Sequence, residues 1–278
     1  MNYNSVRTIH LANLELSRSL GVPYEPIDHS TLNEKHNVLT DYTIPAGEYP
    51  NVGYLAIGRG GHRNIAGNGN AALQDVLQHG ITDAALFEQI PFRLVEVTNA
   101  ATGADSLTAA ERLLYRIRKR ETHNGVEYNA YYLRKITLTQ QQPSIDLLIT
   151  DNGETTSSPF VPSPTMLNPQ PVQAIAGNVV TATGRIISTR LPASVVLEEA
   201  DINHIIEACE IIYGSASFAT ISEMCLTSGV EVPSSHPAYP EIAAAQCCNF
   251  TGVLTHLTWN RDRVRLSYDL GDSSPQLV

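Results

Sequence analysis

The sequence is poor in lysine and in charge of either sign. It has three lysines against fifteen arginines, only 17% of its 278 residues are charged, and the formal net charge is −10. An acidic chain is unsuited to general nucleic-acid binding, because that affinity comes from neutralising phosphates. Lysine is depleted and arginine enriched at protein interfaces. The composition therefore favours a folded protein whose faces are covered by neighbouring chains, and makes a nucleic-acid partner an unfavoured alternative.

The sequence also lacks long apolar runs and paired cysteines. No stretch approaches 18 apolar residues, and the first residues have no signal-peptide core, so we expect a chain made in the cytoplasm without a membrane partner. No Cys-x-x-Cys spacing is present to hold zinc. The cysteines are Cys209, Cys225, Cys247 and Cys248. We expect them to be buried thiols in a reducing compartment.

A glycine-rich stretch at residues 57–70 has five glycines, two arginines and one histidine. No Lys-Ser or Lys-Thr follows it, and no helix pattern opens after it, so neither phosphate-loop motif is present. The favoured interpretation is a structural loop that packs on a neighbouring chain, with Arg59 and Arg63 contacting carboxylates. An anion site formed by His62 and Arg63, as a small-molecule enzyme would have, is an alternative.

Asn124-Gly125 lies between residues that favour strands, which predicts a type I′ hairpin of 117–123 with 126–138. Basic residues and tyrosines cluster on and beside it. They are Arg112, Arg116, Arg118, Lys119, Arg120, Arg134 and Lys135, with Tyr115, Tyr128, Tyr131 and Tyr132. Such a surface suits single-stranded nucleic acid, through stacking and phosphate contacts. In an acidic chain an acidic partner protein is the preferred interpretation.

Further elements follow from hydrophobic spacing and from capping residues. We expect helices at 5–20, at 83–89, from Leu113 after a Thr108–Glu111 capping box, at 198–214 and at 218–227. We expect strands at 54–57, 92–97, 145–150 and 184–197, and a hairpin of 253–259 with 264–270.

Composition changes between Lys135 and Arg185, where there is no basic residue and six prolines occur. We expect an extended, proline-rich arm at 155–171, since such runs are hard to place in a compact domain. The predicted division is an N-terminal α+β domain at 1–140, a linker or arm at 141–183 and a C-terminal α+β domain at 184–278. The predicted fold class is α+β, with small mixed sheets, hairpins and short amphipathic helices in two lobes.

Three further groupings could carry chemistry, and each has a plainer explanation. Asp201, His204 and Glu207 are spaced as loose metal ligands, but they lie on the polar side of a helix, where solvated charge is expected. Ser234-Ser-His236 resembles part of a nucleophile site, yet no Gly-x-Ser-x-Gly turn accompanies it. Cys225 or Cys247 with His256 is better explained by buried structural thiols. We therefore expect no catalytic residue, metal or cofactor.

Phrases between residues 54 and 138 resemble virion structural proteins of large tailed bacteriophages. They are Ile57-Gly-Arg-Gly-Gly-His-Arg63, residues 82–97, residues 107–112 and the stretch Tyr128-Asn-Ala-Tyr-Tyr-Leu-Arg-Lys-Ile136. The resemblance implies a non-enzymatic, oligomeric part of the neck, tail or baseplate, in a ring with other virion proteins. The residues that we assign to a partner interface are Arg59, Arg63, Arg116, Arg118, Lys119, Arg120, Tyr128, Tyr131, Tyr132 and Arg134.

Overall fold

A computed structural model describes residues 5–65, 73–136, 142–168, 181–232, 239–258 and 263–277. The chain divides into two compact units, neither of which is one continuous segment. The first unit is made of residues 1–137 and 197–264, and the second of residues 138–196 and 265–278. This division differs from the expected one. Residues 197–264, which we had placed in a separate C-terminal domain, pack with the N-terminal part of the chain.

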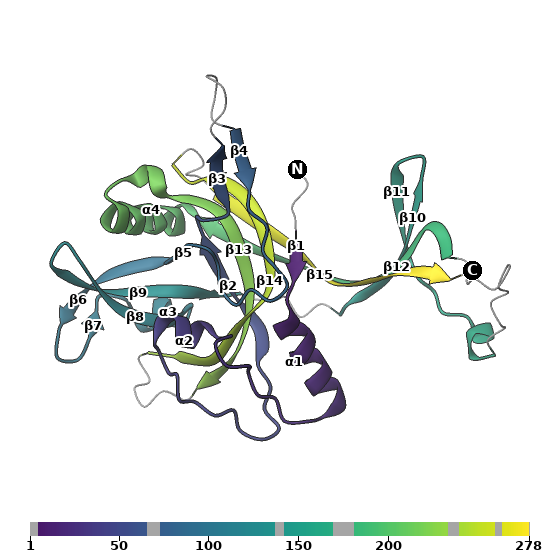
Figure 1. Cartoon of the computed structure of the whole chain (residues 1–278), viewed down its shortest axis with the longest axis horizontal. Coiled ribbons are helices and arrows are strands. Elements are labelled where there is room, and N and C mark those ends of the chain that lie inside the picture. Colours follow the sequence, from purple (N-terminus) through teal and green to yellow (C-terminus); the bar gives the residue numbers. More distant parts are fainter. Residues whose placement is uncertain are drawn as a thin grey trace. The chain divides into compact units, whose positions relative to one another are not determined.

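The first unit is built on a nine-stranded antiparallel sheet (Figure 1). The main strand order is β1-β14-β13-β2-β9-β6-β7, and β5 pairs with β2 while β8 pairs with β9. Its strands are β1 (Ser5–Arg7), β2 (Asn51–Gly58), β5 (Gln89–Ile90), β6 (Arg93–Asn99), β7 (Ala104–Asp105), β8 (Tyr115–His123), β9 (Val126–Lys135), β13 (Thr220–Val232) and β14 (Glu241–His256). A separate pair joins β3 (His62–Ile65) to β4 (Leu73–Val76).

The helix expected at 218–227 is wrong, because this stretch forms the central strand β13. It pairs with β14 on one side and with β2 on the other, and residues 221–230 are buried without interruption. A strand buried on both faces loses the alternation of apolar and polar residues that marks a strand in sequence.

Short helices lie against this sheet. They are α1 (Ile9–Leu20), α2 (Leu32–His36), α3 (Ala109–Arg112) and α4 (Glu199–Tyr213), with a 3₁₀ turn, η2 (Ala216–Phe218). Both α1 and α2 contact β14, and α4 contacts β6 (Figure 1). The helix expected at 5–20 is present only from Ile9, because residues 5–7 form β1, and the helix expected at 198–214 is confirmed. Both helices end at a left-handed glycine, Gly21 and Gly214.

Two other helix predictions are corrected. The Thr108–Glu111 capping box is present, but its helix ends at Arg112 and the chain continues into β8. Residues 83–88 form bends and irregular backbone instead of a helix. There the backbone N–H groups of Phe87 and Glu88 donate to the side chain of Glu223, a distant acceptor that replaces helical hydrogen bonds.

The hairpin predicted at Asn124-Gly125 is confirmed. His123 pairs with Val126, and the two turn residues have φ angles of 51° and 81°. Both positions of a type I′ turn need positive φ, which Asn and Gly adopt at low cost.

The second unit contains a four-stranded sheet in the order β11-β10-β12-β15. The strands are β10 (Ser144–Asp151), β11 (Glu154–Pro159), β12 (Thr181–Glu198) and β15 (Arg263–Leu277), and a 3₁₀ turn, η1 (Pro164–Leu167), follows β11. The segment expected to be extended from 155 thus begins as a paired strand, and its last part, 169–171, lies outside the described residues. The expected pairing of 253–259 with 264–270 is replaced, because β15 pairs with β12.

The chain has both helices and antiparallel sheets and is mostly sheet, which agrees with the α+β class. Among the described residues, no helix is long and apolar enough to cross a membrane.

Candidate functional site

The described part of the glycine-rich stretch, residues 57–65, is held by the protein itself. The backbone N–H of Gly60 donates to Glu223 Oε1 at 3.0 Å, and that of Gly61 donates to Ser222 Oγ at 2.9 Å. A Cβ atom on Gly58 would lie 2.5 Å from Glu223 Oε1, and one on Gly61 would lie 2.5 Å from the Ser222 carbonyl oxygen. These glycines are needed for close approach, and a buried carboxylate occupies the place that a bound anion would take.

Glu223 and His79 form an enclosed polar cluster in the first unit. The two side chains are 2% and 4% exposed, and His79 Nε2 lies 2.8 Å from Glu223 Oε2. The other ring nitrogen, Nδ1, lies 2.9 Å from Asp83 Oδ2. Each nitrogen of the ring therefore faces a carboxylate oxygen, so a ring that donates both bonds is a protonated imidazolium. Both ring nitrogens are thus in hydrogen-bond contact with carboxylates of the same chain.

Glu223 accepts four hydrogen bonds from the described residues. Besides His79 and Gly60, the N–H groups of Phe87 and Glu88 donate to it at 3.0 and 2.9 Å. Burial raises the pKa of the Glu223 carboxyl, but the bonds from His79, Glu88 and Phe87 outweigh burial and leave the pKa below its usual value. The carboxylate thus ties β13 to the loop 58–61 and to residues 87–88.

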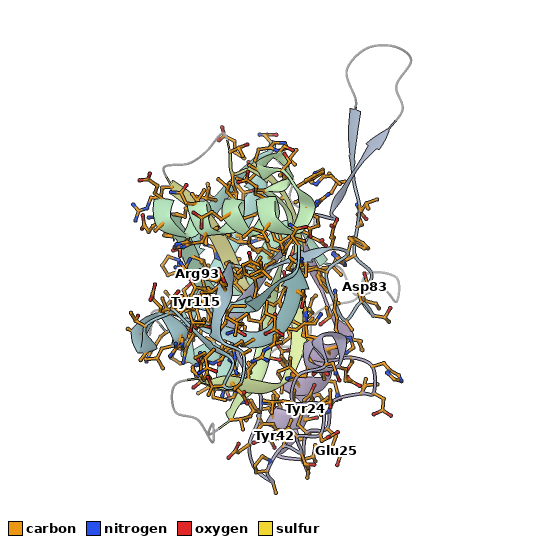
Figure 2. The ribbon with its side chains drawn as sticks, turned by 90° about the vertical axis from the view of Figure 1, so that its left-hand side faces the viewer. Tyr24, Glu25, Tyr42, Asp83, Arg93 and Tyr115 are labelled. Carbon is orange, nitrogen blue, oxygen red and sulfur yellow. The ribbon has the colours of Figure 1, made fainter. Side chains whose placement is uncertain are left out.

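Aromatic rings enclose the same histidine. The His79 ring stacks on Phe87 with centroids 4.0 Å apart and on Phe250 with centroids 3.9 Å apart. Figure 2 shows Asp83 at the edge of the first unit, and its side chain is 35% exposed. Within the described residues, this cluster is suited to holding segments together, and we assign it a structural role.

The arginines of the glycine-rich stretch have different surroundings. Arg59 lies 3.3 Å from Glu88, and its guanidinium sits over the rings of Tyr213 and Phe218 at 4.3 and 4.5 Å. Its side chain is only 21% exposed, so little of it is left for a partner. The side chain of Arg63 lies outside the described part of the structure. Burial lowers the pKa of His62, with a further contribution from the charge of His256.

Many of the basic and tyrosine side chains of the hairpin bond to other residues of the same chain, which corrects the predicted interface. Tyr131 and Tyr132 are buried, and their hydroxyls donate to Asp105 Oδ2 at 2.6 Å and to Glu121 Oε1 at 2.8 Å. The Arg116 side chain is 2% exposed, and Arg116 Nη2 lies 2.8 Å from Glu231 Oε1. These three residues cannot form an exposed surface. Tyr131 and Tyr132 are neighbours on β9 and point to opposite faces of the sheet, and residues 129–133 are all buried, so both faces are covered there.

Glu231 gathers several of these groups. Lys135 Nζ lies 2.6 Å from Glu231 Oε1, and the Tyr54 hydroxyl donates to the same oxygen at 2.8 Å. Burial raises the pKa of this carboxyl, but the bonds from Lys135 and Tyr54 and the charge of Arg116 lower it to about 2. The positive charge that the sequence places on this face is thus partly neutralised by the chain's own carboxylate.

Other basic side chains of the hairpin also have partners in the chain. Arg118 donates to the Gly103 carbonyl at 3.1 Å and lies 3.9 Å over the Tyr239 ring. Arg134 pairs with Asp201 at 2.8 Å. Of the predicted interface, Arg120 is exposed, while Lys119 and Tyr128 are half-buried. The remaining accessible patch is smaller than the sequence suggests.

The groupings that could carry chemistry do not assemble into a site in the described residues. Asp201 pairs with Arg134, and His204 contacts Arg93, whose Nη1 lies 2.6 Å from His204 Nε2. Figure 2 places Arg93 and Tyr115 beneath α4. Residues 234–236 are outside the described part. Among the described residues, no group of three His, Cys, Asp or Glu side chains could hold a metal ion.

The cysteines are all free and buried. Burial raises the pKa of the Cys247 thiol well above its ordinary value, and Cys225 beside it adds to the rise. His256, the partner considered for Cys225 or Cys247 in the disfavoured alternative, lies 2.8 Å from the Thr220 hydroxyl. Fully enclosed, protonated thiols are poor nucleophiles, so these residues act as core side chains.

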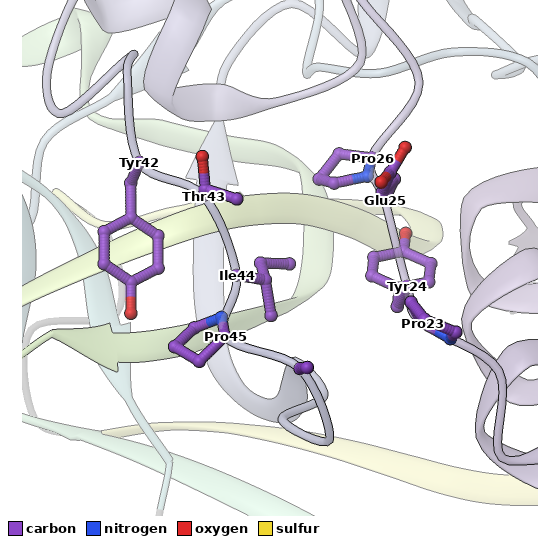
Figure 3. Close-up of a pocket in the computed structure, with 9 residues that line it drawn as sticks. Pro23, Tyr24, Glu25, Pro26, Tyr42, Thr43, Ile44 and Pro45 are labelled. Atoms are coloured by element: carbon purple, nitrogen blue, oxygen red, sulfur yellow. The ribbon is translucent and has the colours of Figure 1, made fainter.

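A pocket of about 480 Å³ lies between two loops of the first unit. Figure 3 shows Pro23, Tyr24, Glu25 and Pro26 on one side and Tyr42 to Pro45 on the other. Tyr24 is buried, and its hydroxyl contacts Gln246. Apart from Glu25, the lining is proline, tyrosine, threonine and aliphatic side chains, which offers contact area but no convergent acid and base. The sequence did not predict the Glu223 cluster, because Glu223 and His79 are 144 positions apart in the chain, and it did not predict the pocket.

Comparison with known proteins gives a family and no activity. No curated protein and no solved structure matches the chain. One family model matches all of it, residues 1–278, and its description is a family of unknown function, DUF7208. The chain therefore belongs to the DUF7208 family.

Proposed function

We propose that this protein is a non-enzymatic structural component of an oligomeric assembly, in which neighbouring chains cover the sheet of the second unit. The resemblance of residues 54–138 to virion proteins of tailed phages makes the neck, tail or baseplate of such a virion the proposed assembly. Other virion structural proteins and further copies of this chain are the proposed partners.

The exposure of the second unit carries the proposal. No residue of β10 or β11 is buried, and every residue of β11 is exposed. Among the described residues of this unit, the buried side chains are Ser188, Val195 and Leu266. A sheet normally gains its stability by burying one face against another layer. In the described part of the second unit, the only helical element is the 3₁₀ turn η1.

Apolar side chains beside this sheet point to protein neighbours. Val161 and Leu167 are 77% and 85% exposed, and Ile145 and Met166 are about half exposed, at 46% and 49%. Exposed apolar groups gathered on one segment mark interaction surfaces more often than isolated ones do. The absence of any basic residue between Lys135 and Arg185 makes a phosphate backbone an unsuitable partner for this segment.

The test is the protein content of purified particles from a phage that encodes this chain. We expect mass spectrometry to find the chain at a fixed copy number, and the double variant Val161→Asp with Leu167→Asp to be left out while still folding. The matched control is Thr122→Asp, an exposed position on β8 of the first unit. Absence of the native chain from the particles contradicts the virion assignment, and normal incorporation of the double variant contradicts the role of this surface.

A further inference from the structure

Strand β11 forms one edge of the four-stranded sheet, and its outer backbone groups have no partner strand in the described residues. Natural proteins usually protect such an edge with lysines, prolines, bulges or a covering segment. The first unit follows this rule at β8, which pairs only with β9 among the described strands and carries Arg118, Lys119 and Arg120. The sequence of β11 is Glu-Thr-Thr-Ser-Ser-Pro, with one charged residue at its first position.

The pairing of β11 with β10 fixes which of its backbone groups face outward. The register is unbroken from Asp151↔Glu154 to Asp146↔Pro159, so no bulge twists the edge away. The N–H of Phe160 donates to the Ile145 carbonyl at 2.8 Å, which places residue 160 among those that bond to β10. In an antiparallel pair these residues alternate, so 154, 156 and 158 face β10 and 155, 157 and 159 face outward.

We propose that β11 pairs antiparallel with β11 of a second copy of this chain, about a twofold axis perpendicular to the sheet. The pairing joins two four-stranded sheets into one continuous sheet. This inference deepens the proposed function, on which it rests for its biological setting, by naming a copy of the chain as the partner at this edge.

The charge on β11 selects the antiparallel direction and a copy of the same chain. Parallel pairing sets the two Glu154 side chains next to each other, which is unfavourable for like charges. Antiparallel pairing moves each Glu154 to the opposite end of the new ladder, where it faces Ser158. The remaining side chains are hydroxyls, and Thr–Thr and Thr–Ser pairs across strands are favourable. The hairpin already contains one, since Thr150 Oγ1 lies 2.9 Å from Thr155 Oγ1.

Pro159 and the twofold axis together fix the register. A twofold axis perpendicular to the sheet leaves the side chains of each face on that face. Residues that lie opposite each other in an antiparallel pair also point to the same face. The axis must therefore pass beside a residue and its own copy, and not between two residues. Centring on Ser157 sets Thr155 against Pro159, whose nitrogen faces outward and has no hydrogen to donate. Centring on Thr156 sets Thr155 against Ser157 twice, and both pairs face outward and can exchange two backbone hydrogen bonds each.

In this register the two copies of Thr156 face each other as a non-hydrogen-bonded pair, with Cα atoms about 4.5 Å apart. That separation lies within the range for a disulfide. The four native cysteines are buried, so an introduced cysteine is the accessible thiol among the described residues. We expect the full chain with Thr156→Cys to form, under mild oxidation, a disulfide dimer of twice the 30.3 kDa monomer mass.

The matched control is Thr155→Cys, which is also exposed. In the proposed register, position 155 lies two residues along the strand from position 155 of the other copy, and its side chain points to the other face of the sheet. We expect it to yield several-fold less dimer. A second variant, Ser157→Pro, removes an outward N–H without removing a bond to β10, and we expect it to abolish the dimer seen by sedimentation velocity. Equal cross-linking at 155 and 156, no cross-linking at 156, or a persistent dimer in Ser157→Pro overturns the proposal.

The outcomes separate this inference from the proposed function. A chain that enters particles but shows no cross-link at position 156 leaves the structural role standing and removes the β11 pairing. A chain that cross-links at position 156 but is absent from particles does the reverse.

Discussion

Replacement of Glu223 by glutamine tests how much of the first unit depends on its buried carboxylate. Two backbone N–H groups donate to Oε1, and one backbone N–H and His79 Nε2 donate to Oε2. A glutamine amide has one oxygen, so its NH₂ group must face two of these donors. If the His79 ring loses its Nε2 proton it can accept from that NH₂, but at least one backbone N–H stays unpaired in either orientation. An unpaired buried donor costs about 1–3 kcal/mol, and the charge-assisted bond to His79 is lost as well.

We expect Glu223→Gln to lower the free energy of unfolding by about 2–5 kcal/mol, a large part of the total for a domain. The measurement is urea denaturation followed by circular dichroism at pH 7. The control is Glu154→Gln, an exposed position where we expect a change within about 0.5 kcal/mol. A loss of less than about 1 kcal/mol in Glu223→Gln would refute the assignment of this carboxylate as the tie between β13 and the loops.

The other predictions address the pH dependence, the glycine-rich loop and the hairpin. The pKa of the Glu223 carboxyl is lower in the folded chain than its ordinary value of 4.5, so its contribution to stability is present above pH 4.5 and is lost as the pH falls further. In urea titrations at acid pH, the difference in free energy of unfolding between the wild type and Glu223→Gln should therefore become smaller. Gly61→Ala should lower the free energy of unfolding by about 1–3 kcal/mol, because the added Cβ would meet the Ser222 carbonyl. Calorimetry of the native chain with ATP, GTP or NAD should give no heat of binding. Arg118→Ala should lower stability by about 1–2 kcal/mol through the lost contact with Tyr239, whereas Lys119→Ala should change it by under about 0.5 kcal/mol; equal effects in thermal melts would contradict this.

Local signals in the sequence predict the elements that depend on near neighbours. Thr8 and Gly21 bound α1, Gly214 ends α4, and Asn124-Gly125 makes the hairpin turn, all through backbone geometry set within a few residues. The errors at 83–88 and 218–227 come from long-range contacts. Glu223 takes the N–H groups of Phe87 and Glu88 from across 135 and more positions of sequence, and β13 is buried on both faces by its neighbours.

The same limit applies to the site. Sequence placed positive charge and tyrosines on one hairpin, but whether they face a partner or the interior depends on Asp105 and Glu231, which come from other parts of the chain. The Glu223–His79 cluster joins residues 144 positions apart, and no local motif marks either one. The glycines at 58, 60 and 61 were the available signal, since their need for close packing was predicted although their partner was not.

The central claim is that neighbouring chains cover the sheet of the second unit, and hydrogen exchange tests it most directly. Amides of residues 144–159 are compared in the dilute free chain and in purified particles, with β13 of the first unit as an internal standard of a buried strand. The account predicts at least about tenfold slower exchange of the outward-facing amides of Thr155 and Ser157 in particles, with little change in β13. Equal exchange at residues 144–159 in the two states would contradict it.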